Sequence, residues 1–202
     1  MLLAPVLVPV TVNAEGASPL APFLLRPGDV TGFVPGKVRV FRTASAVRSA
    51  GGEKLAKSEV RRYESEGFVE AAMVRLHDQA ELSAQGISSV LDFATPGGAN
   101  AEMRAELEED RHPQSTRIEG MPSYLIVRHF KVPGVPKAVG VAFVTNRAAD
   151  RVGLKAGIAK GLFTEGDCLF TIGIFRPTSK NVIEPVAHGI QAVSGRPANP
   201  CL

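Results

Sequence analysis

Tryptophan is absent from this chain of 202 residues, and aromatic residues make up only 6% of it. Packing must therefore rely on aliphatic side chains such as valine, leucine, isoleucine and alanine. The share of hydrophobic residues is 45% and that of charged residues 21%, which is typical of an ordinary globular protein and excludes a disordered chain. The length favours one domain with one sizeable core over two domains.

The chain also lacks an apolar run long enough to cross a bilayer, so we predict no transmembrane helix. The apolar run at residues 2–12 is followed by Val12-Asn13-Ala14, which has small residues where a signal peptidase would cleave. No basic residue precedes this run, and Pro5 and Pro9 interrupt it, which leaves an extended arm of the mature protein as the alternative. We predict a leader or extended N-terminal arm at 1–36, a single α+β domain at 37–202, and an extracytoplasmic location, secreted or in the cell envelope.

A strong excess of one charge is missing as well. The formal net charge is +3, and the basic residues are interleaved with acidic ones, as in Glu59-Val60-Arg61-Arg62. A nucleic-acid-binding protein more often gathers its basic residues on one face or in one tail. We therefore expect no nucleic-acid partner, and the predicted partner is an unknown protein or component of the envelope.

Cysteine is scarce, with two residues, Cys168 and Cys201. Cys168 begins an apolar segment, whereas Cys201 lies in a proline-containing tail where it has no packing role of its own. A disulfide between them would hold the tail beside the sheet and would suit an oxidising compartment. The alternative is two free thiols, one of them buried and inert.

The C-terminal part carries the clearest secondary-structure pattern. Strands are predicted at about 155–163 and 168–175, joined by a turn that contains Gly166-Asp167, and a helix at about 184–193 places Val186, Ile190 and Val193 on one stripe. Further predicted strands lie at 38–41, 68–76, 87–94, 123–130 and 138–146, and further helices at about 53–66 and 96–110. Strands in runs with few alternating βα units predict the α+β class, a mostly antiparallel sheet with helices packed on its faces.

The weak candidates for ligand binding are Thr95, Gly97, Gly98 and His129. The first three lie between a strand and a helix, where free backbone N–H groups and the helix dipole can hold an anion. The alternative for them is a helix start capped by Thr95 with Pro96 in the first turn. His129 lies in an alternating strand, where it faces either water or a ligand.

Established catalytic and metal-binding patterns are missing. The four histidines, His77, His112, His129 and His188, have no metal-ligand spacing, and no nucleophile elbow or zinc-protease motif occurs. We therefore predict no catalytic residue, no metal site and no cofactor. An enzyme would need residues that converge only in the fold, with His77, Asp92 and His129 as the candidates. The acidic run Glu106, Glu108, Glu109 and Asp110 is interpreted as a solvated helix face.

Two fragments are similar to the core of a PDZ domain, namely 151–157 and 165–173. In PDZ domains the two pieces are contiguous, whereas here residues 158–164 separate them. The carboxylate-binding loop of PDZ domains is also missing, so this interpretation is not favoured.

A different resemblance covers residues 24–194. It rests on segment 25–33, on Glu66-Gly67-Phe68-Val69, on 88–109, on Pro133-Gly134-Val135-Pro136-Lys137-Ala138 and on the hairpin 163–173, in that order. In these segments the chain resembles the uncharacterised exported proteins and lipoproteins of high-GC actinobacteria. That resemblance implies a cell-envelope location and no established activity, and a PsbP-like sandwich is compatible by analogy. The lipobox cysteine of lipoproteins is missing here.

Together these observations favour a non-enzymatic extracytoplasmic domain that binds a protein partner, an envelope component or a small apolar ligand. One alternative is an enzyme whose site is assembled only in the fold. The other is a structural subunit or peptide-binding module that uses an exposed sheet edge or the proline-rich arm at residues 2–35.

Overall fold

The computed structural model describes residues 18–49, 52–111, 125–196 and 201, so the apolar run and the possible cleavage site near Ala14 lie outside the described residues. The helices are α1 (Lys57–Ser65), α2 (Pro96–Arg111), α3 (Arg147–Arg151) and α4 (Ile183–Ser194), with short 3-10 turns η1 (Ala21–Phe23) and η2 (Ala44–Ala46). The strands are β1 (Phe33–Pro35), β2 (Arg39–Phe41), β3 (Phe68–Asp78), β4 (Gln85–Phe93), β5 (Leu125–Lys131), β6 (Val139–Thr145), β7 (Gly157–Glu165) and β8 (Cys168–Arg176).

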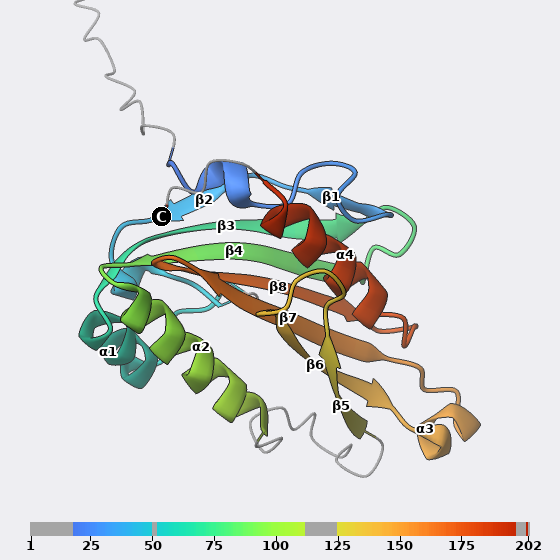
Figure 1. The fold of residues 1–202 in the computed structure, drawn as a ribbon. Helices are drawn as coiled ribbons and strands as arrows, with labels where there is room; N and C mark the ends of the chain where they lie inside the picture. Colours follow the sequence, from blue (N-terminus) through green and yellow to red (C-terminus); the bar gives the residue numbers. More distant parts are fainter. Residues whose placement is uncertain (1–17, 50–51, 112–124, 197–200, 202) are drawn as a thin grey trace, which may run out of the picture.

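These eight strands form one twisted sheet in the order β1-β3-β4-β8-β7-β6-β5, with β2 beside β1 as a second partner of β3 (Figure 1). Every pairing in it is antiparallel. Helices pack on both faces, so the predicted α+β class with a mostly antiparallel sheet is confirmed. Residues 158–164, which separate the two PDZ-like fragments, are the middle of strand β7.

One face of the sheet, here called the α4 face, carries the larger apolar core. The predicted stripe of α4 is buried there, with Val186 and Ile190 fully buried and Val193 nearly so, against Ile172 and Phe170 of β8. Aliphatic side chains at a four-residue spacing place one side of a helix against a sheet, which explains why α4 lies where it does.

The opposite face, here called the α2 face, carries α1, η2 and α2 over one end of β3, β4, β8 and β7. Its core includes Leu91, Leu162 and Leu169 from the sheet, with Met103 and Leu107 of α2 packed against them. The other end of these strands is not covered by α2, and this difference creates the site described below.

The segment before the predicted domain start is part of the packed structure. Leu20, Phe23, Leu24 and Val30 are buried in the core of the α4 face, and β1 pairs with the end of β3. Apolar side chains at 20–33 thus bind residues 18–36 to the sheet, although proline and glycine keep them in turns and short elements. The division into an arm at 1–36 and one domain at 37–202 stays a prediction.

The structure joins Cys168 to Cys201 by a disulfide across 33 residues, with the two Cα atoms 5.5 Å apart. The backbone N–H of Asp167 also donates to the carbonyl oxygen of Cys201 at 2.9 Å. Both cysteines are buried, so residue 201 lies against the first residue of β8.

Candidate functional site

On the α2 face, the exposure of the apolar side chains rises from one end of β7 and β8 to the other. On β8, Leu169 is fully buried beneath the helices, whereas Phe175, six residues on and on the same face, is 37% exposed. On the neighbouring β7, Leu162 is fully buried and Ile158 is 44% exposed. Side chains two residues apart on a strand point to the same face. Each strand therefore passes from a part that the helices cover to a part that they leave open, and apolar side chains lie on the open part as well.

A groove of about 230 Å³ lies in this uncovered part, across β4, β8 and β7. We call it the sheet groove, and on the α2 face it is defined by Gln85, Ile87, Ile158, Lys160, Thr171, Gly173 and Phe175. Gly173 forms its floor, because a Cβ there would lie 3.2 Å from the Ile87 Cγ2 atom and would begin to fill the hollow. Most of the surface that lines the groove is apolar.

Among the described residues that line the sheet groove, Lys160 is the one with a basic side chain, and its charge is balanced. Its Nζ atom lies 3.0 Å from the Glu106 carboxylate and 2.8 Å from that of Asp110, both on α2. Burial alone would lower the pKa of Lys160, but the two carboxylates raise it above its ordinary value, so the ammonium stays charged. The described lining of the groove is therefore mostly apolar and carries no unbalanced cation.

The acidic run on α2 is only in part the solvated face that the sequence indicated. Glu106 and Asp110 face Lys160, and Glu109 pairs with Arg62 of α1. Glu102, one turn earlier, is fully buried and accepts from Arg62 Nε at 2.7 Å and Nη2 at 2.8 Å. The interpretation holds for Glu108 and Glu109, which are exposed. It is wrong for Glu106 and Asp110, because α2 turns their carboxylates toward Lys160 of β7.

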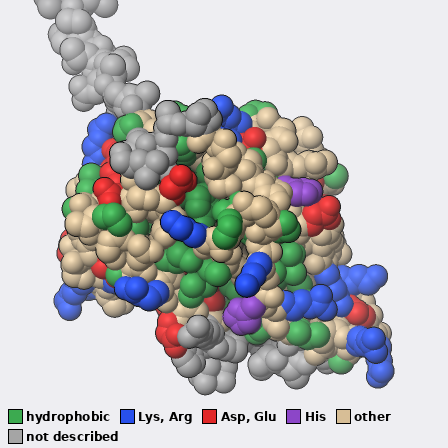
Figure 2. All heavy atoms as spheres, viewed as in Figure 1, with side chains coloured by type: hydrophobic (Ala, Val, Ile, Leu, Met, Phe, Trp, Pro, Cys, Tyr) green, Lys and Arg blue, Asp and Glu red, His purple; other side chains and the backbone are tan. Residues whose placement is uncertain are grey.

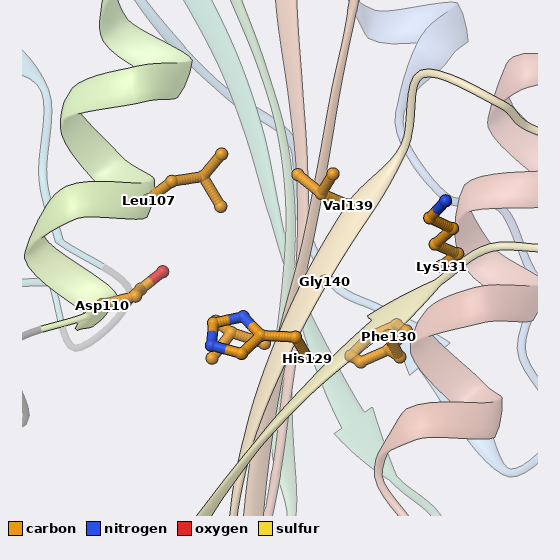
Figure 3. Close-up of a pocket in the computed structure, with 8 residues that line it drawn as sticks. Leu107, Asp110, His129, Phe130, Lys131, Val139 and Gly140 are labelled. Carbon is orange, nitrogen blue, oxygen red and sulfur yellow. The ribbon is translucent and has the colours of Figure 1, made fainter.

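A second hollow of about 330 Å³ lies beside β5, β6 and the end of α2 (Figure 3). His129 points toward α2 there, on the same side as Asp110 and Leu107, whereas the neighbouring Phe130 points to the opposite side. In the space-filling view, hydrophobic side chains gather between α2 and α4, with basic and histidine side chains around them (Figure 2). This hollow contains the predicted candidate His129, and the carboxylate of Asp110 that borders it already contacts Lys160.

The three residues considered for an enzyme do not meet. His77 on β3 and His129 on β5 belong to strands separated by four others in the sheet order, and they line different pockets. Asp92 belongs to the α4 face, where its Oδ1 atom lies 3.8 Å from the Cys168 sulfur. Burial raises the pKa of Asp92, and Cys168 and Cys201 beside it are joined to each other, so they offer no thiolate to a metal ion.

Two of the three candidates at the start of α2, Thr95 and Gly98, have structural roles. The Thr95 hydroxyl accepts a hydrogen bond from the Gly98 backbone N–H at 3.2 Å, as a cap does. A Cβ on Gly98 would overlap the carbonyl oxygen of Glu66, whereas a Cβ on Gly97 would meet nothing closer than the Thr95 hydroxyl at 3.5 Å. Gly98 is thus explained by the close approach of α2 to the end of α1.

The sheet groove could not be predicted from the sequence, because its walls come from three strands, β4, β8 and β7. One signal was available, since Gly173 interrupts the apolar alternation of β8 and a glycine inside a strand often marks a close approach. Among the described residues, no helix combines the length and apolar character required to cross a membrane.

The fold and the groove define a class of protein, an α+β domain whose antiparallel sheet carries helices on both faces and leaves a groove on one of them. No protein-family model matches the chain, and no curated protein matches it. The fold is similar to the crystal structure of the extracellular domain of PknH from Mycobacterium tuberculosis. The similarity has a TM-score of 0.53 and 12% identity, and it covers 86% of this chain and 91% of that one.

Proposed function

We propose that this protein is a non-enzymatic, extracytoplasmic binding domain that holds an apolar segment of a ligand in the sheet groove. The observation that carries the proposal is the apolar surface left open by α2, with Ile158 and Phe175 both more than one-third exposed beside Gly173. Ligand sites are concave and mostly apolar, with a few polar groups. Drug-sized ligands need roughly 300–1,000 Å³, so the groove's 230 Å³ suits a narrow apolar chain.

The extracytoplasmic location is supported by two observations. The disulfide between Cys168 and Cys201 suits an oxidising compartment, because such bonds are rare in the cytosol. The similar structure is an extracellular domain from a mycobacterium, which accords with the resemblance to exported proteins of high-GC actinobacteria. Mass spectrometry of the protein from the outer fraction of an expressing cell tests this, and recovery of the chain only from the cytosol would contradict it.

The groove is tested by filling it. Gly173→Val adds a side chain against Ile87, and we expect binding of the neutral fluorescent dye Nile red to fall by about tenfold or more, since each buried methylene contributes roughly 0.8 kcal/mol. Ala80→Val, at an exposed position after β3, is the matched control and should bind the dye like the unmodified chain. Equal dye binding by all three proteins would reject the groove as the site.

The edge strand β5 supports a second candidate, pairing with the same strand of a second copy. Among the described strands β5 is bonded only to β6, and its Ile126 and Val127 are 40% and 38% exposed. An uncovered apolar edge strand is a ready partner for another strand. Sedimentation should then show a dimer that Val127→Lys converts to a monomer, whereas a monomeric unmodified chain would remove this candidate.

A further inference from the structure

A cluster of basic side chains lines a pocket of about 220 Å³ on the α2 face, beside β2 and β3. We call it the basic pocket, and its five basic residues are Lys37, Arg39, Arg48, Arg75 and His77. They come from the link before β2, from β2 itself, from the segment after η2 and from β3. No acidic side chain of the described chain lines this pocket.

The charges of the basic pocket are gathered without a carboxylate among them. Lys37, Arg39 and His77 are exposed, and Arg48 and Arg75 are half-buried. Other half-buried cations face carboxylates, as in Arg62 with Glu109, Lys160 with Glu106, Arg176 with Asp78, Lys180 with Asp150 and Arg196 with Asp29. Within the part of the chain that the structure describes, Lys37, Arg39, Arg75 and His77 make no ion pair and no side-chain hydrogen bond. Like charges held together without a counter-charge attract an anion.

The walls of the pocket position Arg48 by hydrogen bonds and leave room for Arg75. Arg48 Nη1 donates to the carbonyl oxygens of Ser45, Ala46 and Val47 at 3.1, 2.8 and 2.9 Å, so its charge is positioned without being neutralised by a carboxylate. Gly52 has a φ of 89°, and a Cβ there would overlap the Arg75 guanidinium. The glycine therefore lets the loop backbone come close to this guanidinium. A guanidinium is planar and can donate two parallel hydrogen bonds, so it suits a phosphate, sulfate or carboxylate group.

The basic pocket adjoins the sheet groove. In the pairing of β3 with β4, Arg75 lies opposite Ile87 and His77 opposite Gln85. Directly opposite residues of an antiparallel pair share a face, with Cβ atoms about 4.5–5.5 Å apart. Arg75 and His77 line the basic pocket, whereas Ile87 and Gln85 line the sheet groove, so charged and apolar surfaces are separated by one strand spacing.

We propose that these two surfaces form one site for an anionic amphiphile, a molecule with an apolar chain and a phosphate, sulfate or carboxylate head. The proposal rests on the proposed function. It adds the chemistry of the ligand's head group and the orientation of the ligand in the site. The chain lies over Gly173 between Ile87 and Phe175, and the head lies toward Arg75 and Arg39. The opposite orientation is disfavoured because Lys160, on the β7 side, is already neutralised by Glu106 and Asp110.

The test compares three probes by isothermal titration below the concentration at which they aggregate: dodecyl phosphate, dodecanol and inorganic phosphate. We expect dodecyl phosphate to bind at least about tenfold more tightly than dodecanol, because charge-assisted contacts to the head add to the apolar burial. Arg39→Gln with Arg75→Gln should remove this advantage and leave dodecanol binding unchanged. Arg61→Gln, at an exposed position on α1, should leave all affinities unchanged.

The outcomes separate the two proposals. If both dodecyl compounds bind equally, are blocked by Gly173→Val and ignore the arginine substitutions, the groove stands and the head-group site is rejected. If inorganic phosphate binds as tightly as dodecyl phosphate, the pocket holds a free anion and the amphiphile is rejected. If neither dodecyl compound binds, the groove proposal fails as well. A circular dichroism spectrum of each variant establishes that it is folded before titration.

Discussion

At the scale of single residues, Glu102 on α2 is an ionisable group with no exposure to solvent. Its carboxylate is fully buried, and burial raises its pKa to about 8 from an ordinary value of 4.5. Hydrogen bonds from Arg62 act in the opposite direction, whereas the neighbouring Glu66 raises the pKa further. The folded protein therefore holds a proton at Glu102 at pH values where the unfolded chain has released it.

The free energy of unfolding should consequently fall as the pH rises from about 4.5 to about 8. The raised pKa of Glu102 makes the folded state bind more protons across this window, so stability decreases with pH there, by up to about 5 kcal/mol. Urea unfolding measured through the window checks the slope. Glu102→Gln should flatten it, and Glu108→Gln, at an exposed position on the same helix, should keep it. An unchanged slope in Glu102→Gln would contradict the buried proton.

Individual residues were predicted well where their role is local. Thr95 as a helix cap depends on the next three residues, and the structure has that hydrogen bond to Gly98. The ion pairs of Glu106, Glu109 and Asp110 could not be predicted, because their partners, Arg62 and Lys160, lie about fifty residues away in either direction. Charge partners at such separations are decided by packing, and no local pattern contains them.

At the scale of elements, the hairpin β7–β8 and the helix α4 follow closely the alternation and the four-residue stripe seen in the sequence. The short helix α3 was missed. Asn146, which ended the predicted strand, caps this helix by accepting hydrogen bonds from Ala148 and Ala149 at 2.8 and 3.1 Å. A five-residue helix has too few positions for an apolar period to appear.

The placement of α2 gives a paired prediction. Gly98→Ala should destabilise the protein by about 2–3 kcal/mol, because its Cβ would overlap the Glu66 carbonyl and push α2 away from α1. Gly97→Ala, one residue earlier in the same turn, has room for its Cβ and should stabilise the helix by about 0.5–1 kcal/mol. Thermal or urea unfolding of both variants checks this, and equal effects of the two substitutions would show that α2 does not approach α1 as described.

At the scale of the whole molecule, the disulfide links the C-terminal residues to the sheet. For a loop of 33 residues, the chain-entropy model gives about 3–4 kcal/mol of stabilisation. Reducing agent should lower the free energy of unfolding by that amount, and Cys201→Ala should show the lower value with no further response to the reducing agent. An intact mass equal to that of the fully reduced chain, with no effect of reductant, would remove the bond from the account.

The sheet class was predictable because strands in runs give an antiparallel arrangement, but the order of the strands and the two pockets were not. The basic pocket combines two pairs of residues, Lys37 with Arg39 and Arg75 with His77. The members of each pair are two residues apart in an extended segment, so their side chains lie on the same face. The sequence contains both pairs, yet only the pairing of β2 with β3 brings them together. Basic residues that are interleaved with acidic ones along the sequence are therefore gathered in one pocket of the folded protein.

The most direct test of the account is a crystal structure of the chain with dodecyl phosphate. The account predicts the alkyl chain along Ile87, Gly173 and Phe175 and the phosphate within hydrogen-bond distance of Arg75. A ligand found instead in the hollow beside His129, or an empty groove at saturating dodecyl phosphate, would contradict it.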